Sequence, residues 1–454
     1  MMIPLDRVLR EVDESREEIL DLAKSLVGLD TSNTGTPDSG NETRVTAFLA
    51  KRLSREGIPR IRLLGRVPSR KNLVVSLPGR NRRCALLFLS HCDVVPSGAV
   101  TAWATRPFSP TVRGGRLYGR GAADMKGTLT AQVIALVVAR RLGLRLDAGV
   151  RLLCVADEEA GGRFGAGWLR KHYPHLLRAD LALNEGGGHC YLVNGRLVYG
   201  VARGEKGRYE AIVLFRGAGA HASTPWRGIN AITRAAEFVH RVTSRPPTAS
   251  PNAVLVRPFR VIASDLVMNR SGFDEFLDSL ASRNEPLATE LRALTRTTIT
   301  PTIIAGGVKS NSVPDECRVV CDVRTLPSVR AADVRRQLER HAKGLSADIE
   351  LSITASPSVS IVPTKFMRLI HEALCVSSGR QVELLSTMTL GFTDSRFARE
   401  VGTLALGCAP DGIVGEGAEA RMHGPNESIG LESLYLRARF YASAIALAAG
   451  NGQP

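Results

Sequence analysis

Five short motifs contain acids and histidines of the types that bind metal ions. They are SHCDVVP with His91 and Asp93, GRGAADMKG with Asp124, DEEAGG with Glu158 and Glu159, NEGGG with Glu185, and MHGPNE with His423. Several of these acids stand at the end of an apolar run, where a carboxylate is unfavourable unless it is paired or binds a cation. A mixture of histidine, aspartate and glutamate suits Zn²⁺, and also Mn²⁺ or Co²⁺. The residue types therefore indicate a metal site, although one such acid alone is more often a cap or a surface group.

The spacing of the first motif suggests how a histidine ligand would be oriented. Side chains two positions apart on a strand share a face, so His91 and Asp93 point the same way and Cys92 points to the opposite face. A histidine that binds metal usually donates its other ring N–H to an orienting group, often a carboxylate. We therefore expect Asp93 to orient the His91 ring.

The elements around these motifs alternate between helices and buried strands. Helical patterns cover residues 5–29, a segment that ends at Gly57, and residues 128–141. The apolar runs NLVVSLPG and CALLFLSHCDVVP predict a hairpin across PGRNRR, and the run GVRLLCVA predicts a buried strand that ends before Asp157. This alternation predicts an α/β domain with a mainly parallel sheet. Functional residues gather at the carboxyl ends of the strands in such sheets.

The character of the sequence changes after Tyr199. The segments RYEAIVLFRGAGAH, VVCDVRTLP and IELSITASP are strand-like, and helical patterns cover residues 229–243, 273–281, 287–295 and 331–344. One-sided alternation with separate helices predicts a smaller α+β domain. We predict a discontinuous metal-binding catalytic domain of residues 1–198 and 356–454, with residues 199–355 inserted into it.

Composition limits the class of protein and its partners. The chain has 454 residues, of which 44% are apolar and 23% charged, as is typical of globular proteins. The net charge of +16 permits nucleic acid as a partner, but the basic residues are scattered and aromatic residues make up only 5%. We therefore favour a solvated basic surface over a nucleic-acid site.

The N-terminal segment and the cysteines bear on location. The first residues lack the apolar core of a signal peptide, and the longest apolar stretch, around residues 131–139, is too short to span a bilayer. The eight cysteines are spread along the chain without a C-x-x-C pair, which favours reduced thiols. We expect a cytoplasmic protein that has neither a membrane nor a nucleic acid as partner.

In order and spacing, the five motifs resemble those of the two-zinc metallopeptidase family of acetylornithine deacetylase, succinyl-diaminopimelate desuccinylase, aminoacylase-1 and glutamate carboxypeptidases. Further matches are GAGAHASTPWRGINAI, GGVKSNSVPD, DVRTLP and GFTDSR, so the similarity extends from about residue 30 to about residue 441. The set as a whole is specific, whereas each motif alone is weak. The resemblance implies a zinc-exopeptidase-like catalytic domain with an inserted α+β dimerisation or lid domain.

The resemblance also implies a role for each motif residue. The two-zinc site would consist of His91 and Glu185 on one metal, His423 and Glu159 on the other, and Asp124 as the bridge between them. Glu158 would be the general base that activates a water held between the metals, and Asp93 would orient His91.

The inserted domain would supply further residues and form a homodimer. In the family its histidine, here His221, reaches the partner's active site and helps to stabilise the oxyanion. Arg324 and Asn311 match positions that hold the substrate carboxylate, Asn230 lies near the same cleft, and Gly391 matches a loop that lines the substrate pocket. The less favoured alternatives are that Arg324 is a surface charge and that Asn311 is a turn former before Pro314.

Departures from the family pattern bear on the substrate. Phe392 stands where a second glycine is common, and the lid carries an extra stretch over about residues 245–295. A longer lid resembles the carboxypeptidase-S-like and N-acyl-amino-acid hydrolase branch. Glu185, in place of aspartate, favours acylases, deacetylases and carboxypeptidases over dipeptidases.

We therefore expect a metal-dependent hydrolase of an amide bond next to a free carboxylate, in an N-acyl amino acid or a short peptide. The alternative is a catalytically silent binding homologue on the same fold, which would lack a ligand or the base, yet all these positions are filled. A nucleic-acid-binding protein would need a clustered basic stripe and a steep dependence of affinity on salt.

Overall fold

The computed structural model of the chain describes residues 3–244, 247–250 and 270–450. These residues form two compact units. The first unit runs to Arg203 and resumes over Ser360–Met388 and again from Thr393, and the second comprises Gly204–Val359 and the short segment Thr389–Phe392. The second unit thus extends from 204 to 359, where the inserted domain was predicted over 199–355.

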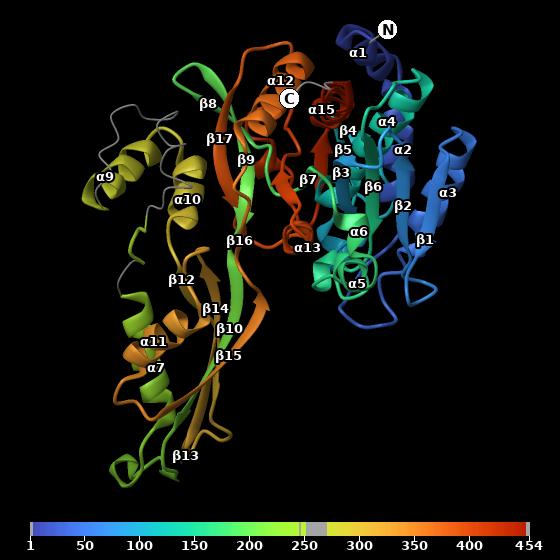
Figure 1. Cartoon of the computed structure of the whole chain (residues 1–454). Helices are drawn as coiled ribbons and strands as arrows, with labels where there is room; N and C mark the ends of the chain where they lie inside the picture. Colours follow the sequence, from blue (N-terminus) through green and yellow to red (C-terminus); the bar gives the residue numbers. More distant parts are fainter. Residues whose placement is uncertain (1–2, 245–246, 251–269, 451–454) are drawn as a thin grey trace. The chain divides into compact units, whose positions relative to one another are not determined.

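A mixed sheet forms the centre of the first unit, with the strand order β1-β2-β6-β3-β7-β18-β9 (Figure 1). The bounds are Arg60–Leu64 for β1, Asn72–Leu77 for β2, Gly149–Val155 for β6, Cys84–His91 for β3, Leu181–Asn184 for β7, Leu404–Gly407 for β18 and Arg196–Glu205 for β9. The neighbours β6, β3, β7 and β18 run parallel, and β1, β2 and β9 run antiparallel to their neighbours. Strands β8 (Cys190–Val193) and β17 (Glu383–Thr389) also pair with β9. This is the predicted α/β class, with a mixed sheet in which the four central strands are parallel.

The predicted hairpin between β2 and β3 is wrong, because β6 lies between these two strands. Strand β6 pairs antiparallel with β2 and parallel with β3. The run PGRNRR instead packs against the segment before β6, where the Arg80 and Asn81 amides donate to the backbone oxygens of Leu146 and Asp147. An apolar strand buried on both faces takes a central place in a sheet, and the turn-like linker alone does not determine its neighbours.

Helices cover both faces of this sheet. One face packs on α1 (Leu5–Glu14), α2 (Arg16–Val27), α3 (Thr43–Arg55), α4 (Gly127–Arg141), α12 (Thr364–Ser378) and α15 (Leu431–Gly450). The other face packs on α5 (Ala166–His172), α6 (Pro174–Leu177) and α13 (Ser395–Glu400). Alternate residues of β3 serve the two faces: Leu86 and Phe88 join the first core, and Leu87 and Leu89 join the second. The helix predicted over residues 5–29 is in fact two helices that meet at Ser15.

One helical stretch, Ala122–Arg141, is long and apolar enough to cross a membrane by length and composition. The prediction that the longest apolar stretch, around residues 131–139, is too short to span a bilayer therefore underestimated the length of this helical stretch. Of the most apolar window, 89% is buried inside the first unit, as in the core helix of a globular domain. Its contacts with α15 and the sheet account for its apolar character.

The carboxyl ends of three neighbouring parallel strands carry the motif acids and the first histidine. His91 is the last residue of β3, the turn with Glu158 and Glu159 follows β6, and Glu185 follows β7. A small sheet of β4 (Thr111–Arg113), β5 (Arg116–Tyr118) and β19 (Ser428–Gly430) joins the MHGPNE segment to the chain just before Asp124. The topology thus gathers motifs that lie far apart in the sequence.

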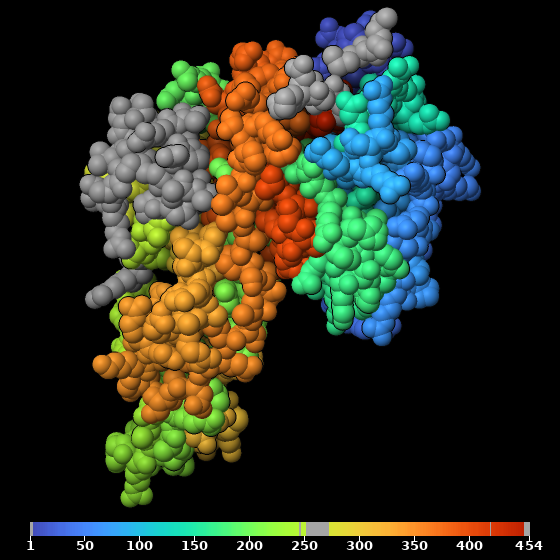
Figure 2. All heavy atoms as spheres, in the orientation of Figure 1, coloured from blue at the N-terminus to red at the C-terminus, as the bar shows by residue number. Residues whose placement is uncertain are grey.

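The second unit is an antiparallel sheet with helices on one face. Its strand order is β12-β14-β10-β15, with bounds Thr298–Gly306, Glu316–Thr325, Gly207–Arg216 and Ala347–Ala355. The inner face packs on α7 (Ala231–Thr243) and α11 (Ala331–Ala342). Helices α9 (Arg270–Ala281) and α10 (Glu285–Leu294) pack on each other, and β11 (Ala220–His221) pairs with β13 (Ser312–Val313). Figure 2 shows the surface of the end of the unit that carries β13, where the atoms are coloured yellow-green and gold.

Candidate metal centre

Asp124 lies between two histidines, each of which faces a different carboxylate oxygen. His91 Nε2 is 3.0 Å from Asp124 Oδ1, and His423 Nε2 is 3.1 Å from Asp124 Oδ2. The helical segment η2 (Ala122–Lys126) is broken at Asp124, which has φ −118° and ψ 97°. A Cβ at Gly127 would lie 2.5 Å from the backbone oxygen of Ala122, so the tight turn into α4 requires a glycine.

The two glutamates predicted as terminal ligands divide between the histidines. Glu185 Oε1 lies 3.4 Å from His91 Nε2, and Glu159 Oε2 lies 3.3 Å from His423 Nε2. This is the same grouping that the resemblance assigns to two metals. Ligand atoms of His91, Asp124 and Glu159 lie within 4.8 Å of one another, and so do those of His91, Glu158 and Glu185.

Asp93 contacts both the His91 ring and the turn that carries Glu158 and Glu159. Its backbone oxygen lies 2.9 Å from His91 Nδ1, whereas its carboxylate is 3.6 Å from that nitrogen. The carboxylate instead accepts the backbone N–H groups of Glu158, at 3.1 Å, and of Glu159, at 3.2 Å. Asp93 therefore orients the His91 ring mainly through its main chain and fixes the glutamate turn through its side chain.

The electrostatics of the centre indicate a shortage of positive charge. Burial raises the pKa of Glu185 to about 8, and burial likewise raises the pKa values of Glu158 and Glu159. Hydrogen bonds to Asp124 and Glu159 raise the pKa of His423 to about 10. Burial alone would lower the pKa of His91, but the charge of Glu185 and the neighbouring aspartates raise it well above its usual value. Divalent cations held by these residues would oppose the rise in the carboxylate pKa values.

The donor set fits divalent metal ions. Four carboxylates and two imidazoles converge, and two divalent cations would balance the four negative charges. One buried oxygen of Glu158 and one of Glu159 have no hydrogen-bond partner among the described residues. Imidazole nitrogens together with carboxylate oxygens suit Zn²⁺, Mn²⁺ and Co²⁺. His91, Asp124, Glu159, Glu185 and His423 would hold the metals.

Sequence reasoning missed a buried ion pair that supports this centre. Glu427 Oε1 accepts the backbone N–H groups of Ala123, at 2.9 Å, and of Asp124, at 3.0 Å. Its Oε2 lies 2.6 Å from Arg120 Nη1, and Arg120 Nη2 donates to the backbone oxygen of His423. The pair therefore joins the bridging carboxylate to the loop of the second histidine. The signal was present in the final residue of the MHGPNE motif.

Asp394 is a second residue that sequence reasoning missed. It lies in the GFTDSR motif, is 1% exposed, and neither of its carboxylate oxygens has a hydrogen-bond partner among the described residues. Burial raises the pKa of Asp394 to about 7. Its charge adds to the effect of burial on the pKa of Glu158.

The predicted residues other than the five ligands, Glu158 and Asp93 all belong to the second unit. His221 is exposed, with Nδ1 2.7 Å from Ser223 Oγ, and Asn311 is exposed beside β13. Asn230 caps α7, because its side-chain oxygen accepts the amides of residues 232 and 233. Arg324 is held by Asp322 at 2.6 Å, and a Cβ at Gly391 would lie 3.9 Å from Arg324 Nη1. Gly391 and Arg324 are thus neighbours, whereas roles in a substrate site stay predictions.

Comparisons with known proteins identify the family of the chain. The description "Peptidase family M20/M25/M40" matches residues 87–447, well over half of the chain. A family M20 metallo-carboxypeptidase from Sulfolobus solfataricus has a similar fold, with 18% identity, a TM-score of 0.73, and coverage of 95% of this chain and 99% of that one. Human carnosine dipeptidase 1 is 17% identical, with a TM-score of 0.72 and coverage of 98% of this chain and 99% of that one. A dinuclear metal-binding M20 peptidase from Bacillus subtilis is 12% identical, with a TM-score of 0.62 and coverage of 96% of this chain and 99% of that one. The chain belongs to peptidase family M20 and is a hydrolase of the metallopeptidase type that uses divalent metal ions.

Proposed function

We propose that the protein is a dinuclear amidohydrolase that cleaves an amide bond next to a free carboxylate, in an N-acyl amino acid or a short peptide. Zn²⁺ is the proposed metal, with Co²⁺ or Mn²⁺ as alternatives. The observation that carries the proposal is the position of Asp124, whose two oxygens face His91 and His423 separately. A single metal site would not need a second histidine on the other oxygen of the same carboxylate.

When bound, two such metals polarise the scissile carbonyl and make an attacking water more acidic. Glu158 takes the proton of that water and delivers it to the leaving amine nitrogen. Its buried Oε1, which has no partner among the described residues, is available for this transfer. The backbone of Glu158 stays fixed meanwhile, because its amide is bound to Asp93.

Recognition of the substrate is assigned to the second unit. Arg324 would bind the substrate carboxylate, since a planar guanidinium matches a carboxylate with two parallel hydrogen bonds. Its Nε and Nη2 contact Asp322, and its Nη1 donates a long hydrogen bond of 3.5 Å to the Leu390 backbone oxygen. The Nη1 edge, beside Gly391, would meet the substrate. Asn311 and Asn230 would line the same pocket, and His221 would stabilise the oxyanion.

We also propose a homodimer in the cytoplasm. Strand β12 is one of the two edge strands of the second unit's sheet, and its Ile303 and Ile304 side chains are exposed together with the nearby Val308. An exposed apolar edge strand favours pairing with another chain. All eight cysteines are free, which supports a reducing compartment.

The test is hydrolysis of a substrate panel by metal-loaded and chelated protein. The panel contains N-acetyl, N-succinyl and longer N-acyl amino acids, with dipeptides alongside. Chelator-sensitive release of a free amino acid is expected, together with loss of turnover when the substrate carboxylate is amidated. Turnover that is indifferent to this amidation would contradict the proposed specificity, and absence of turnover with every metal would favour the silent homologue.

A further inference from the structure

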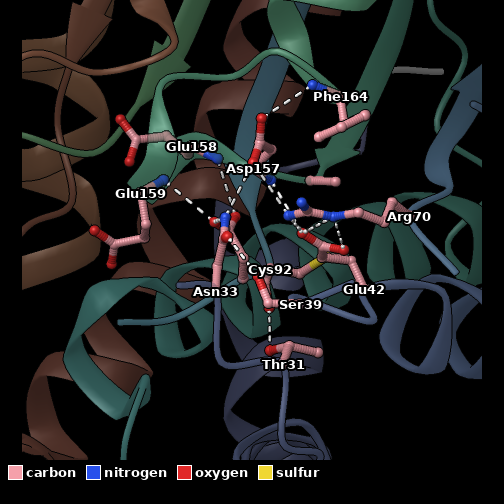
Figure 3. Close-up of polar contacts among 12 residues, drawn as sticks. Thr31, Asn33, Ser39, Glu42, Arg70, Cys92, Asp157, Glu158, Glu159 and Phe164 are labelled. Carbon is pink, nitrogen blue, oxygen red and sulfur yellow. Dashed lines mark hydrogen bonds and ion pairs between the residues drawn. The ribbon is translucent and has the colours of Figure 1, made fainter. Parts of the chain in front are cut away.

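A buried polar network lies beside the turn that carries Glu158 and Glu159 (Figure 3). Its members come from separate segments of the first unit and are at most 5% exposed: Asn33, Glu42, Arg70, Asp93 and Asp157. In Figure 3 the carboxylates of Glu158 and Glu159 point away from this network, while their backbone nitrogens point into it. The network therefore acts on the backbone of the turn and leaves both carboxylates available.

Arg70 connects two carboxylates of the network. Its Nε lies 3.0 Å from Glu42 Oε2, and its Nη2 lies 2.5 Å from Glu42 Oε1 and 3.1 Å from Asp157 Oδ1. The guanidinium also stacks over the Phe164 ring, with 4.8 Å between its carbon and the ring centroid. A Cβ at Gly40 would lie 2.5 Å from Arg70 Nη2, so the guanidinium fits here only because residue 40 is a glycine.

Asp157 holds the backbone conformation that starts the turn. Its φ of 67° lies in the left-handed region, which is unfavourable for a residue other than glycine. Contacts of both the backbone and the side chain of Asp157 hold this conformation. The Asp157 amide donates to Glu42 Oε1, and its side chain accepts from the Phe164 amide and from Arg70.

Asn33 extends the network to the carboxylate of Asp93. Its Nδ2 lies 3.1 Å from Asp157 Oδ1 and 2.8 Å from Asp93 Oδ2. Asp93 in turn accepts the amides of Glu158 and Glu159. An unbroken series of contacts therefore links Arg70 to the backbone of the proposed base.

We propose that Arg70 is a positioning residue for the general base: through Asp157, Asn33 and Asp93 it fixes the backbone from which Glu158 reaches the reacting atoms. Arg70 pairs with two buried carboxylates, those of Glu42 and Asp157, and a side chain without its planar fork cannot satisfy both in the same geometry. The inference rests on the proposed function for its kinetic consequences only.

The test compares Arg70→Lys with Arg437→Lys. Arg437 is a matched control, because it is also buried, at 7% exposure, and pairs with Asp411 at 3.0 Å in the same unit. In Arg70→Lys we expect kcat to fall about 10- to 100-fold with little change in KM or metal content. In Arg437→Lys we expect a lower melting temperature with kcat retained. Equal loss of kcat in both variants, or none in Arg70→Lys, would overturn the proposal.

A double-mutant cycle shows whether the effect passes through Glu158. In a Glu158→Gln background, Arg70→Lys is expected to cause no further fall in kcat, because the group that it positions is already absent. A second full loss in that background would contradict the inference. Should Arg70→Lys fail to fold, Asp157→Asn serves in its place, since it keeps the shape of the side chain and removes the charge that faces Arg70.

Hydrogen exchange separates failure of this inference from failure of the proposed function. Arg70→Lys should speed exchange at the Glu158 and Glu159 amides, and Arg437→Lys should leave it unchanged. This readout needs no substrate. A wild type without amidase activity would therefore remove the proposed function, whereas unchanged exchange in Arg70→Lys would remove the positioning role.

Discussion

Glu158 combines a fixed backbone with a buried carboxylate that lies beside His91 and Glu185. Its amide is bound to Asp93, while its Oε1 is buried without a partner. Burial, together with the charges of Glu185 and Asp394, raises the pKa of Glu158 well above its usual value. Bound divalent cations would favour the ionised form of the same group. This balance suits a carboxylate that accepts a proton from water and then gives it up.

We predict that Glu158→Gln lowers kcat by about 10²- to 10⁴-fold, because glutamine keeps the size of the side chain but cannot accept the proton. Metal content, measured by mass spectrometry, should stay near that of the wild type. Glu400→Gln is the control, since Glu400 is a half-exposed surface acid paired with Arg170. Wild-type turnover in Glu158→Gln would contradict the role of this residue as the base.

At the scale of elements, the parallel strands β6, β3 and β7 bring the ligand motifs together. Apolar runs that end in acids predicted this correctly, because carboxyl ends of parallel strands meet at one edge. The order of β2, β6 and β3 was not predictable in the same way, since PGRNRR has the composition of a hairpin turn. The role of Arg70 was not predictable either. Its partner Glu42 is 28 positions away, and only the packing of the folded chain brings the two side chains together.

The ion pair of Glu427 and Arg120 likewise joins segments that are about 300 positions apart. We predict that Glu427→Gln lowers metal affinity about 10- to 100-fold, because it leaves Arg120 buried without its counter-charge and loosens Asp124. Equilibrium dialysis against a metal buffer measures this directly. Glu419→Gln, in the same segment but half exposed, should bind metal normally. Unchanged affinity in Glu427→Gln would show that the pair does not hold the centre.

At the scale of the whole molecule, metal binding, protonation and stability are linked. At Glu185 and His423 the folded metal-free chain binds more protons than the unfolded chain, because their pKa values are raised to about 8 and about 10. A raised folded pKa gives stability that is complete below the unfolded pKa, near 4.5 for Glu185 and 6.5 for His423. That stability is lost as the pH rises through about 8 and then about 10.

We therefore predict that the melting temperature of the metal-free protein falls between about pH 6 and about pH 8, whereas that of the metal-loaded protein changes much less. Differential scanning fluorimetry with and without a chelator compares the two forms. Metal uptake near neutral pH should also release protons, which calorimetry in buffers of different ionisation enthalpy detects. Equal pH dependence of both forms would contradict this linkage.

The second unit allows a separate prediction about assembly. The double change Ile303→Lys and Ile304→Lys on β12 should convert the proposed dimer into a monomer, since it places charge on an apolar edge strand. Sedimentation velocity reports the mass. Ile353→Lys on β15, at the opposite edge of the sheet, is the control and should leave the dimer intact. A dimer that survives the β12 change would require another interface.

The central claim is that two metals, bridged by Asp124, are needed for amide hydrolysis. Titration of metal-free protein with Zn²⁺, while release of the amino acid from an N-acyl amino acid is followed, tests it most directly. Turnover is expected to rise until two equivalents per chain are bound and then to stay constant. Two tightly bound metals without turnover on any member of the panel, or full turnover in the metal-free protein, would contradict it.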